Sequence, residues 1–293
     1  MPNTVTWEPA AIPAGDRELP ARVYRPVPTR ASAGDYRSPA PSVIVWAHGG
    51  SWRSGSVAEW HPALAHLASL TGATVVGVDY RLAPENPHPA PLVDVLAALD
   101  WADELAGGAP VAVGGDSAGA TLAASAALVR RDAGRPLAAQ LLAYPPIDPA
   151  CRAASYGRDP GAFPRRADLA AAWRAYRGGG ANSGTAHRST AHRSTAHQNT
   201  PYSSSTPYYS TPADAADVTG VAPAALVVGT LDPVADDVRA YAARLAAADV
   251  PVVLHELPGV GHGAFLGSPE FRRRLAAAYR ATRHAYTLDR STR

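Results

Sequence analysis

The chain alternates between short, continuously apolar runs and longer stretches in which apolar residues recur every three or four positions. The apolar runs predict buried strands at 42–47, 73–78, 111–113, 138–144, 225–228 and 252–255, with a strand fragment at 22–24. Helical periodicity predicts helices at 57–70, 92–105, 120–131, 168–177, 235–247 and 269–286. Strands that are apolar on both faces and alternate with helices indicate an α/β fold, with a mostly parallel sheet covered by helices on both faces.

Polar clusters follow three of the predicted strands. They comprise residues 48–51, the pair Asp116 and Ser117, and Asp232. In open α/β sheets, ligands bind beyond the carboxyl ends of the strands. These clusters therefore predict a functional site at that edge of the sheet.

Composition narrows the class of protein. The 293 residues carry a net charge of +2, with 46% hydrophobic residues, which indicates neither a nucleic-acid-binding surface nor a membrane-binding one. Cys151 is the single cysteine, so no intrachain disulfide is possible, and we interpret it as a spare thiol. No apolar run is long enough to span a bilayer, and residues 1–8 lack the features of a signal peptide. We expect a cytoplasmic protein.

One segment, residues 178–212, departs from the α/β pattern, because it is nearly all Gly, Ser, Thr, Ala, His, Tyr and Pro, with short internal repeats. We expect one domain over 1–293, with a cap or insert at 160–215 and a mobile low-complexity loop at 182–206. The histidines of the repeats could suggest a metal site, but no acidic or cysteine ligand stands near them, so we predict no metal. These histidines are His187, His192 and His197.

Residues 115–119 read Gly-Asp-Ser-Ala-Gly, between a predicted strand and a predicted helix. This setting is typical of a nucleophile elbow, which would expose Ser117 at the start of the helix. The alternative is a glycine-rich turn in which Ser117 only caps the helix.

A serine nucleophile needs a base and an acid, which follow it in the order acid, then histidine, in this kind of fold. His262 lies in a glycine-rich loop after the last predicted strand, and Asp232 directly follows the strand before it. Asp236 and Asp237 open the next helix, where acidic residues have a structural reason to occur. We therefore predict Ser117, His262 and Asp232 as a catalytic triad. Backbone N–H groups of Gly49, Gly50 and Ala118 are the expected oxyanion donors.

These motifs resemble the hormone-sensitive-lipase-like esterases of the α/β-hydrolase superfamily. The resemblance rests on His-Gly-Gly-Ser at 48–51, Asp-Tyr-Arg-Leu-Ala-Pro-Glu at 79–85, and residues 115–119, with the acid run at 232–237 and the histidine loop at 261–265. It implies the α/β-hydrolase fold and hydrolysis of small-molecule carboxylic esters with short acyl chains, without a cofactor. It also implies the same triad and oxyanion donors.

The resemblance further implies supporting residues. Asp79, Arg81 and Glu85 would hold the oxyanion loop, and His48 would be structural. Trp52, Tyr144 and Trp173 are candidates for the substrate pocket.

Three features depart from the family pattern. Ser51 replaces a glycine of the oxyanion motif and precedes Trp52, which also resembles the arylformamidases and leaves an amide substrate open. The chain reaches its first strand early, which predicts a reduced cap, and residues 182–206 stand where relatives have a short connection.

A third hypothesis is a non-catalytic binding protein, like the plant gibberellin receptors. The presence of His262 argues against it. The oligomeric state stays open, with a homodimer as one option.

Overall fold

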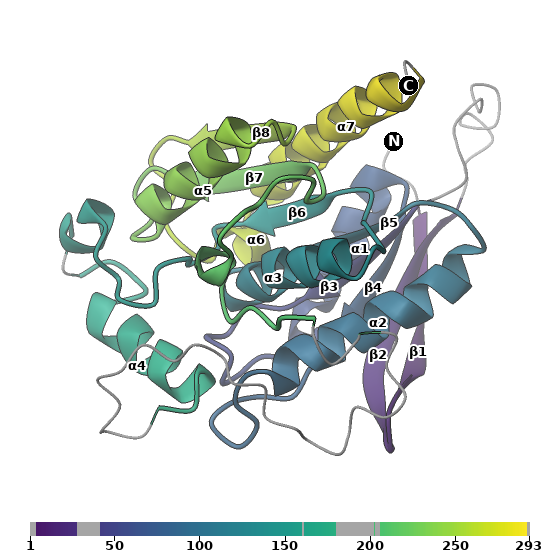
Figure 1. Cartoon of the computed structure of the whole chain (residues 1–293), viewed down its shortest axis with the longest axis horizontal. Helices are drawn as coiled ribbons and strands as arrows, with labels where there is room; N and C mark the ends of the chain where they lie inside the picture. The colour runs from purple at the N-terminus through teal and green to yellow at the C-terminus, as the bar shows by residue number, and fades with distance from the viewer. Residues whose placement is uncertain (1–3, 28–41, 160, 180–201, 203–205, 292–293) are drawn as a thin grey trace.

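The computed structural model describes residues 4–27, 42–159, 161–179, 202 and 206–291. They form an eight-stranded sheet in the order β1-β2-β4-β3-β5-β6-β7-β8 (Figure 1). Six strands are parallel, namely β3 (Val43–Ala47), β4 (Thr74–Val78), β5 (Val111–Asp116), β6 (Gln140–Ala143), β7 (Ala224–Gly229) and β8 (Val252–Leu257). The predicted mostly parallel sheet is therefore confirmed.

An antiparallel hairpin extends one edge of the sheet. It consists of β1 (Thr4–Ala14) and β2 (Arg17–Val27), and β2 pairs with β4. The apolar pattern of the sequence predicted only a strand fragment at 22–24 in this region. Most of β1 is exposed and only Ile12 is buried, so β1 lacks the alternation by which a strand is recognised. Pairing with β2 along its whole length stabilises it instead.

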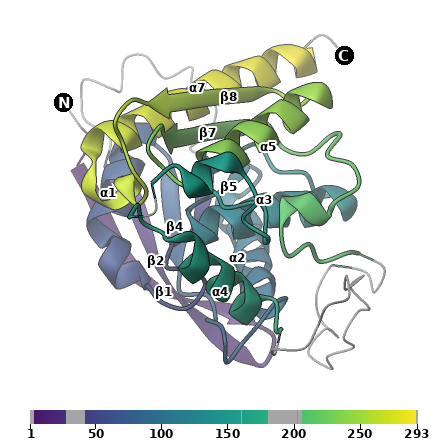
Figure 2. The ribbon, with the colours of Figure 1, turned by 90° about the vertical axis from the view of Figure 1, so that its left-hand side faces the viewer.

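Helices cover both faces of the sheet, as predicted. On one face, α1 (Val57–Thr71) packs against α7 (Pro269–Ser291) (Figures 1 and 2). On the other face, α2 (Ala90–Ala106) packs against α3 (Ala118–Asp132), and α5 (Ala235–Ala247) contacts β7 and β8. Each of these five helices begins within three residues of its predicted first residue.

Four shorter elements complete the described fold. They are η1 (Ala154–Gly157), α4 (Arg166–Tyr176), η3 (Pro212–Asp214) and α6 (Ala264–Gly267). Helix α4 stands off the sheet, in the region expected to form the cap (Figure 2).

The expected loop at 182–206 falls largely outside the described residues, as do the three repeat histidines. In the part of the chain that is described, no helix is both long and apolar enough to cross a bilayer.

Candidate active site

Ser117 lies at a sharp turn between β5 and α3. Its φ of 52° falls in the left-handed region that non-glycine residues rarely adopt. The turn also needs its flanking glycines, because a Cβ at Gly119 would lie 2.1 Å from the Ala47 carbonyl oxygen, and one at Gly115 would lie 2.4 Å from Gly119. The side chain of Ser117 caps no N–H of α3, which removes the structural alternative for this serine.

The Ser117 hydroxyl faces an imidazole. Ser117 Oγ lies 2.8 Å from His262 Nε2, and His262 Nδ1 lies 2.9 Å from both carboxylate oxygens of Asp232. This arrangement places an N–H on Nδ1, donating to the carboxylate, and leaves Nε2 to accept the serine proton. The side chains of His262 and Asp232 are almost wholly buried. The structure thus brings the three predicted triad residues together from the ends of β5, β7 and β8.

Close backbone contacts bring the two loops of the acid and the histidine together. Gly229, at the end of β7, allows this approach, because a Cβ there would lie 2.0 Å from the Val260 carbonyl oxygen. Leu231 N donates to the same oxygen at 3.0 Å. Asp232 is itself oriented by Val234 N, which donates to its Oδ1 at 2.9 Å.

The ring of Tyr144 packs against the predicted catalytic residue His262. Its centroid lies 4.6 Å from that of the imidazole, and the Tyr144 hydroxyl accepts a hydrogen bond from Phe265 N at 2.9 Å. Arg272 also holds this segment, donating to the carbonyl oxygens of Phe265 and Leu266. Tyr144 is fully buried, and burial raises the pKa of its phenol well above the ordinary value, so it is a neutral packing group.

Asp116 is a buried carboxylate beside the nucleophile, and its sequence motif predicted no separate role for it. Its Oδ1 accepts hydrogen bonds from Trp60 Nε1 at 2.7 Å, from Trp46 Nε1 at 3.2 Å and from Gly49 N at 3.2 Å. Burial raises its pKa to about 7, although the three donors and the charge of His262 act in the opposite direction. Asp116 therefore ties the loop after β3 to the nucleophile turn.

The bond to Asp116 corrects one predicted oxyanion donor. The N–H of Gly49 is occupied by the carboxylate, so it is not available to a substrate oxygen. Across the described residues, the N–H groups of Gly50, Ser51 and Ala118 have no protein acceptor. The backbone of Gly50 (φ 113°) and Ser51 (φ 57°) is left-handed, which turns the loop after β3.

His48 and Asp79 hold this loop from behind. The His48 ring stacks on Tyr80 at 4.4 Å, and its Nδ1 lies 2.6 Å from the Gly49 carbonyl oxygen. Burial lowers the pKa of His48, so the ring is neutral and structural, as expected. Asp79 Oδ1 accepts from Val57 N at 2.6 Å, which fixes the start of α1.

Two residues that were expected to hold the oxyanion loop, Arg81 and Glu85, form no hydrogen bond or ion pair with it in the described structure. Arg81 binds the buried carboxylate of Asp94 on α2, with distances of 2.8–3.2 Å, instead of the loop. Glu85 is exposed and makes no hydrogen bond or ion pair within the described residues. Motif membership alone does not tell which way a side chain points, so both expectations were wrong.

Trp52 and Trp173 join the cap region to the oxyanion loop. The Trp52 ring lies 4.3 Å from that of Trp173 and stacks on Tyr176 at 4.7 Å. Both indoles are buried, and neither N–H has a hydrogen-bond partner among the described residues. Contact of these two indoles with substrate stays a prediction, as does the contact predicted for Tyr144.

Comparison with known proteins agrees with this geometry. A family model described as alpha/beta hydrolase fold matches residues 44–266. The chain is 35% identical over 255 residues to the carboxylesterase NlhH of Mycobacterium tuberculosis, covering 85% of this chain and 72% of that protein. A bacterial heroin esterase has a TM-score of 0.75 and 32% identity, covering 96% of this chain and 84% of that one.

A further solved structure, an esterase of the bacterial hormone-sensitive lipase family, has a TM-score of 0.72 and 27% identity. It covers 97% of this chain and 86% of that one. The elbow and the ordered acid and histidine loops fit the same group. The chain belongs to the hormone-sensitive-lipase-like esterases of the α/β-hydrolase fold.

Proposed function

We propose that this protein is a serine carboxylesterase that hydrolyses short-chain carboxylic esters through an acyl-enzyme intermediate. One observation carries the proposal, the continuous line of hydrogen bonds from Ser117 Oγ through His262 to Asp232. A serine hydroxyl is a weak nucleophile at neutral pH, and an oriented imidazole activates it. The relative named carboxylesterase supports the ester as substrate.

The first half of the reaction acylates the serine. His262 Nε2 takes the proton of Ser117 as Oγ attacks the ester carbonyl carbon, and Asp232 stabilises the imidazolium that forms. The resulting tetrahedral intermediate collapses when His262 gives this proton to the leaving alcohol oxygen. The acyl group is then held on Ser117 as an ester.

The second half releases the acid. His262 takes a proton from a water molecule, and the resulting hydroxide attacks the acyl carbon. Collapse of this second intermediate returns the proton to Ser117 and frees the carboxylic acid. No cofactor takes part in either half.

The negative charge of each intermediate falls on the former carbonyl oxygen. Because Gly49 is occupied, we assign its binding to the N–H groups of Gly50, Ser51 and Ala118. Ala118 opens α3, and a helix N-terminus favours negative charge. Loss of one such donor costs about 3 kcal/mol of transition-state stabilisation.

Hydrolysis of p-nitrophenyl acetate and butyrate tests the proposal. We expect Ser117→Ala to abolish turnover of both esters. Ser125→Ala is a matched control, because Ser125 is buried within α3 and its hydroxyl has no hydrogen-bond partner in the described chain. Full activity in Ser117→Ala would reject the assignment.

An amide substrate is the second candidate, with the same triad. It is favoured by Ser51 followed by Trp52 in the oxyanion loop, a pattern that resembles the arylformamidases. Parallel kcat/KM values for ethyl acetate and N-formylkynurenine decide between the two. A higher value for the formamide would make the protein an amidase.

The proposal also covers the domain organisation of the chain and the cellular location of the protein. We assign residues 1–293 to one domain, with 160–215 as its cap. The single cysteine, Cys151, is buried, which suits a reducing compartment such as the cytoplasm. Fractionation of cells and elution volume on a sizing column test the location and the oligomeric state.

A further inference from the structure

Three exposed apolar side chains belong to segments that carry the site: two lie near the catalytic residues in the sequence, and one contacts the histidine. The large apolar side chains that are exposed in the described chain are Trp7, Val27, Phe163, Leu231 and Leu266. Trp7 and Val27 lie on the β1–β2 hairpin, away from the site. Leu231 directly precedes Asp232, and Leu266 follows His262 by four positions. Of these residues, Phe163 is the one whose ring contacts a catalytic side chain, so its exposed surface is a candidate for contact with substrate.

Phe163 is the most exposed of these residues and touches the catalytic imidazole. Its ring meets that of His262 edge-on, with 5.8 Å between ring centroids and 63° between planes. At the same time, 71% of the residue's surface is open to solvent. The ring therefore has one edge on the catalytic base and the rest free for a further contact.

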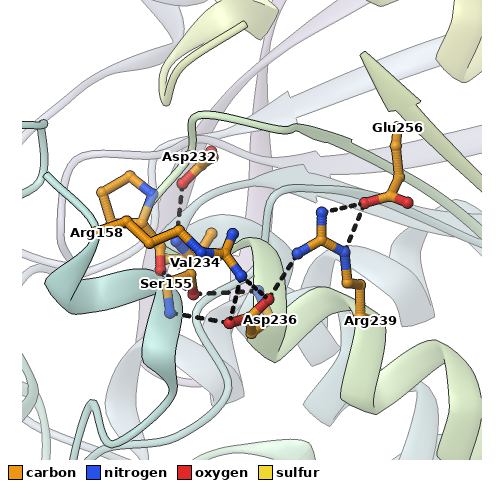
Figure 3. Close-up of polar contacts among 8 residues, drawn as sticks. Ser155, Arg158, Asp232, Val234, Asp236, Arg239 and Glu256 are labelled. Atoms are coloured by element: carbon orange, nitrogen blue, oxygen red, sulfur yellow. Dashed lines mark hydrogen bonds and ion pairs between the residues drawn. The ribbon is translucent and has the colours of Figure 1, made fainter. Parts of the chain in front are cut away.

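The segment before Phe163 is anchored to the loop of the catalytic acid. Ser155 N donates to Asp236 Oδ2 at 2.8 Å, and Ser155 Oγ donates to the Pro233 carbonyl oxygen at 2.7 Å (Figure 3). Arg158 Nη2 reaches both oxygens of Asp236 at 2.9 and 3.0 Å. Pro233 and Asp236 flank Val234, whose N–H orients Asp232.

The same carboxylate links this segment to β8. Asp236 accepts from Arg239 Nη1 at 2.6 Å, and Arg239 also pairs with Glu256 on β8 (Figure 3). The strand that leads to His262 and the segment that leads to Phe163 are therefore held by one network. This network holds the segment up to Arg158, and the ring contact with His262 holds Phe163 itself near the histidine.

The proton transfer by His262 indicates which part of the substrate lies near Phe163. In acylation, His262 Nε2 gives its proton to the oxygen of the leaving alcohol, so this oxygen must come within hydrogen-bond reach of the imidazole. The carbonyl oxygen points away from it, toward the oxyanion donors. Phe163 contacts the ring of the same imidazole, so its side chain lies near the path of the alcohol part of the ester.

We infer that Phe163 determines specificity for the alcohol part of the ester. Its ring forms an apolar binding surface that favours esters of aromatic or bulky apolar alcohols. This inference rests on the proposed esterase function and names its substrate class. An aromatic alcohol group would cover the open face of the ring and bury both surfaces. Aromatic pairs contribute beyond the area that they bury.

Two ester series separate the alcohol side from the acyl side. The first compares benzyl acetate with ethyl acetate, whose alcohols are of the same primary type. The second compares ethyl hexanoate with ethyl acetate. In Phe163→Ala, we expect the benzyl-to-ethyl ratio of kcat/KM to fall about tenfold, which corresponds to about 1.4 kcal/mol. The hexanoate-to-acetate ratio should stay unchanged.

Two further variants control the result. Trp7→Ala removes another exposed aromatic ring, far from the site, and should leave both ratios unchanged. Phe163→Leu keeps an apolar side chain without the ring and should give an intermediate benzyl-to-ethyl ratio. Thermal unfolding of Phe163→Ala should match that of the parent, because the side chain is mostly exposed.

The kcat/KM ratios of Phe163→Ala distinguish the possible roles of this side chain. A selective fall in the benzyl-to-ethyl ratio supports the inference. An equal fall for all esters would show that Phe163 only positions His262, and a fall in the hexanoate-to-acetate ratio would place it on the acyl side; both overturn the inference. Failure of the esterase proposal looks different, because the parent would then hydrolyse none of these esters or Ser117→Ala would keep its activity.

Discussion

Asp116→Asn tests the buried carboxyl group beside the nucleophile. The change keeps Oδ1 as an acceptor for Trp46, Trp60 and Gly49, removes the ability to ionise and puts an amide NH2 in the place of Oδ2. Its neighbours include the phenols of Tyr80 and Tyr144, whose pKa values its charge helps to raise, and the imidazole of His262. The amide does not titrate, so the pH dependence of the difference between variant and parent reports the cost of placing a charge in this setting.

The magnitude follows from the pKa. Burial raises the pKa of Asp116 from 3.8 to about 7, so the unfolded chain loses this proton before the folded protein does. As the pH rises from 3.8 to about 7, the free energy of unfolding of the parent falls relative to that of the variant. The full difference is about 4 kcal/mol, of which about 2 kcal/mol falls between pH 5 and pH 7.

Urea unfolding of both proteins at pH 5, 6, 7 and 8 measures this difference. We expect Asp116→Asn to gain about 2 kcal/mol over the parent from pH 5 to pH 7, with a smaller change above pH 7. Asp16→Asn, at an exposed position, is the matched control and should show no such trend. A difference between Asp116→Asn and the parent that stays constant with pH would refute the reasoning.

Two other substitutions address the oxyanion loop and the acid. Ser51→Gly should raise the free energy of unfolding by about 1 kcal/mol and keep esterase activity, because the φ of 57° suits glycine, and a loss of stability in urea would contradict this. Asp232→Asn should lower kcat about 10⁴-fold, because the amide no longer holds the His262 tautomer; a fall below tenfold would move the role of acid to another carboxylate, such as Asp237.

The sequence predicted the sheet and the triad because both depend on local signals. Buried parallel strands read as continuous apolar runs, so β3 to β8 were found close to their observed bounds. The carboxyl ends of parallel strands share one edge of the sheet, so residues after β5, β7 and β8 were expected to meet. Ser117, Asp232 and His262 do meet there.

Features that depend on tertiary contacts were not predicted. Strand β1 was missed because its stability comes from β2 and not from its own buried residues. Gly49 was misassigned because its partner, Asp116, is turned toward it by indoles from β3 and α1. Phe163 gave no sequence signal, since only the folded chain brings it to His262.

Covalent labelling of the nucleophile tests the central claim most directly. The protein is treated with a fluorophosphonate probe, digested and mapped by peptide mass spectrometry. We expect one adduct, on Ser117, that is absent in Ser117→Ala and forms much more slowly in His262→Ala, because the imidazole activates the serine. An esterase-active protein whose adduct lies on another residue, or that forms none, would contradict this expectation.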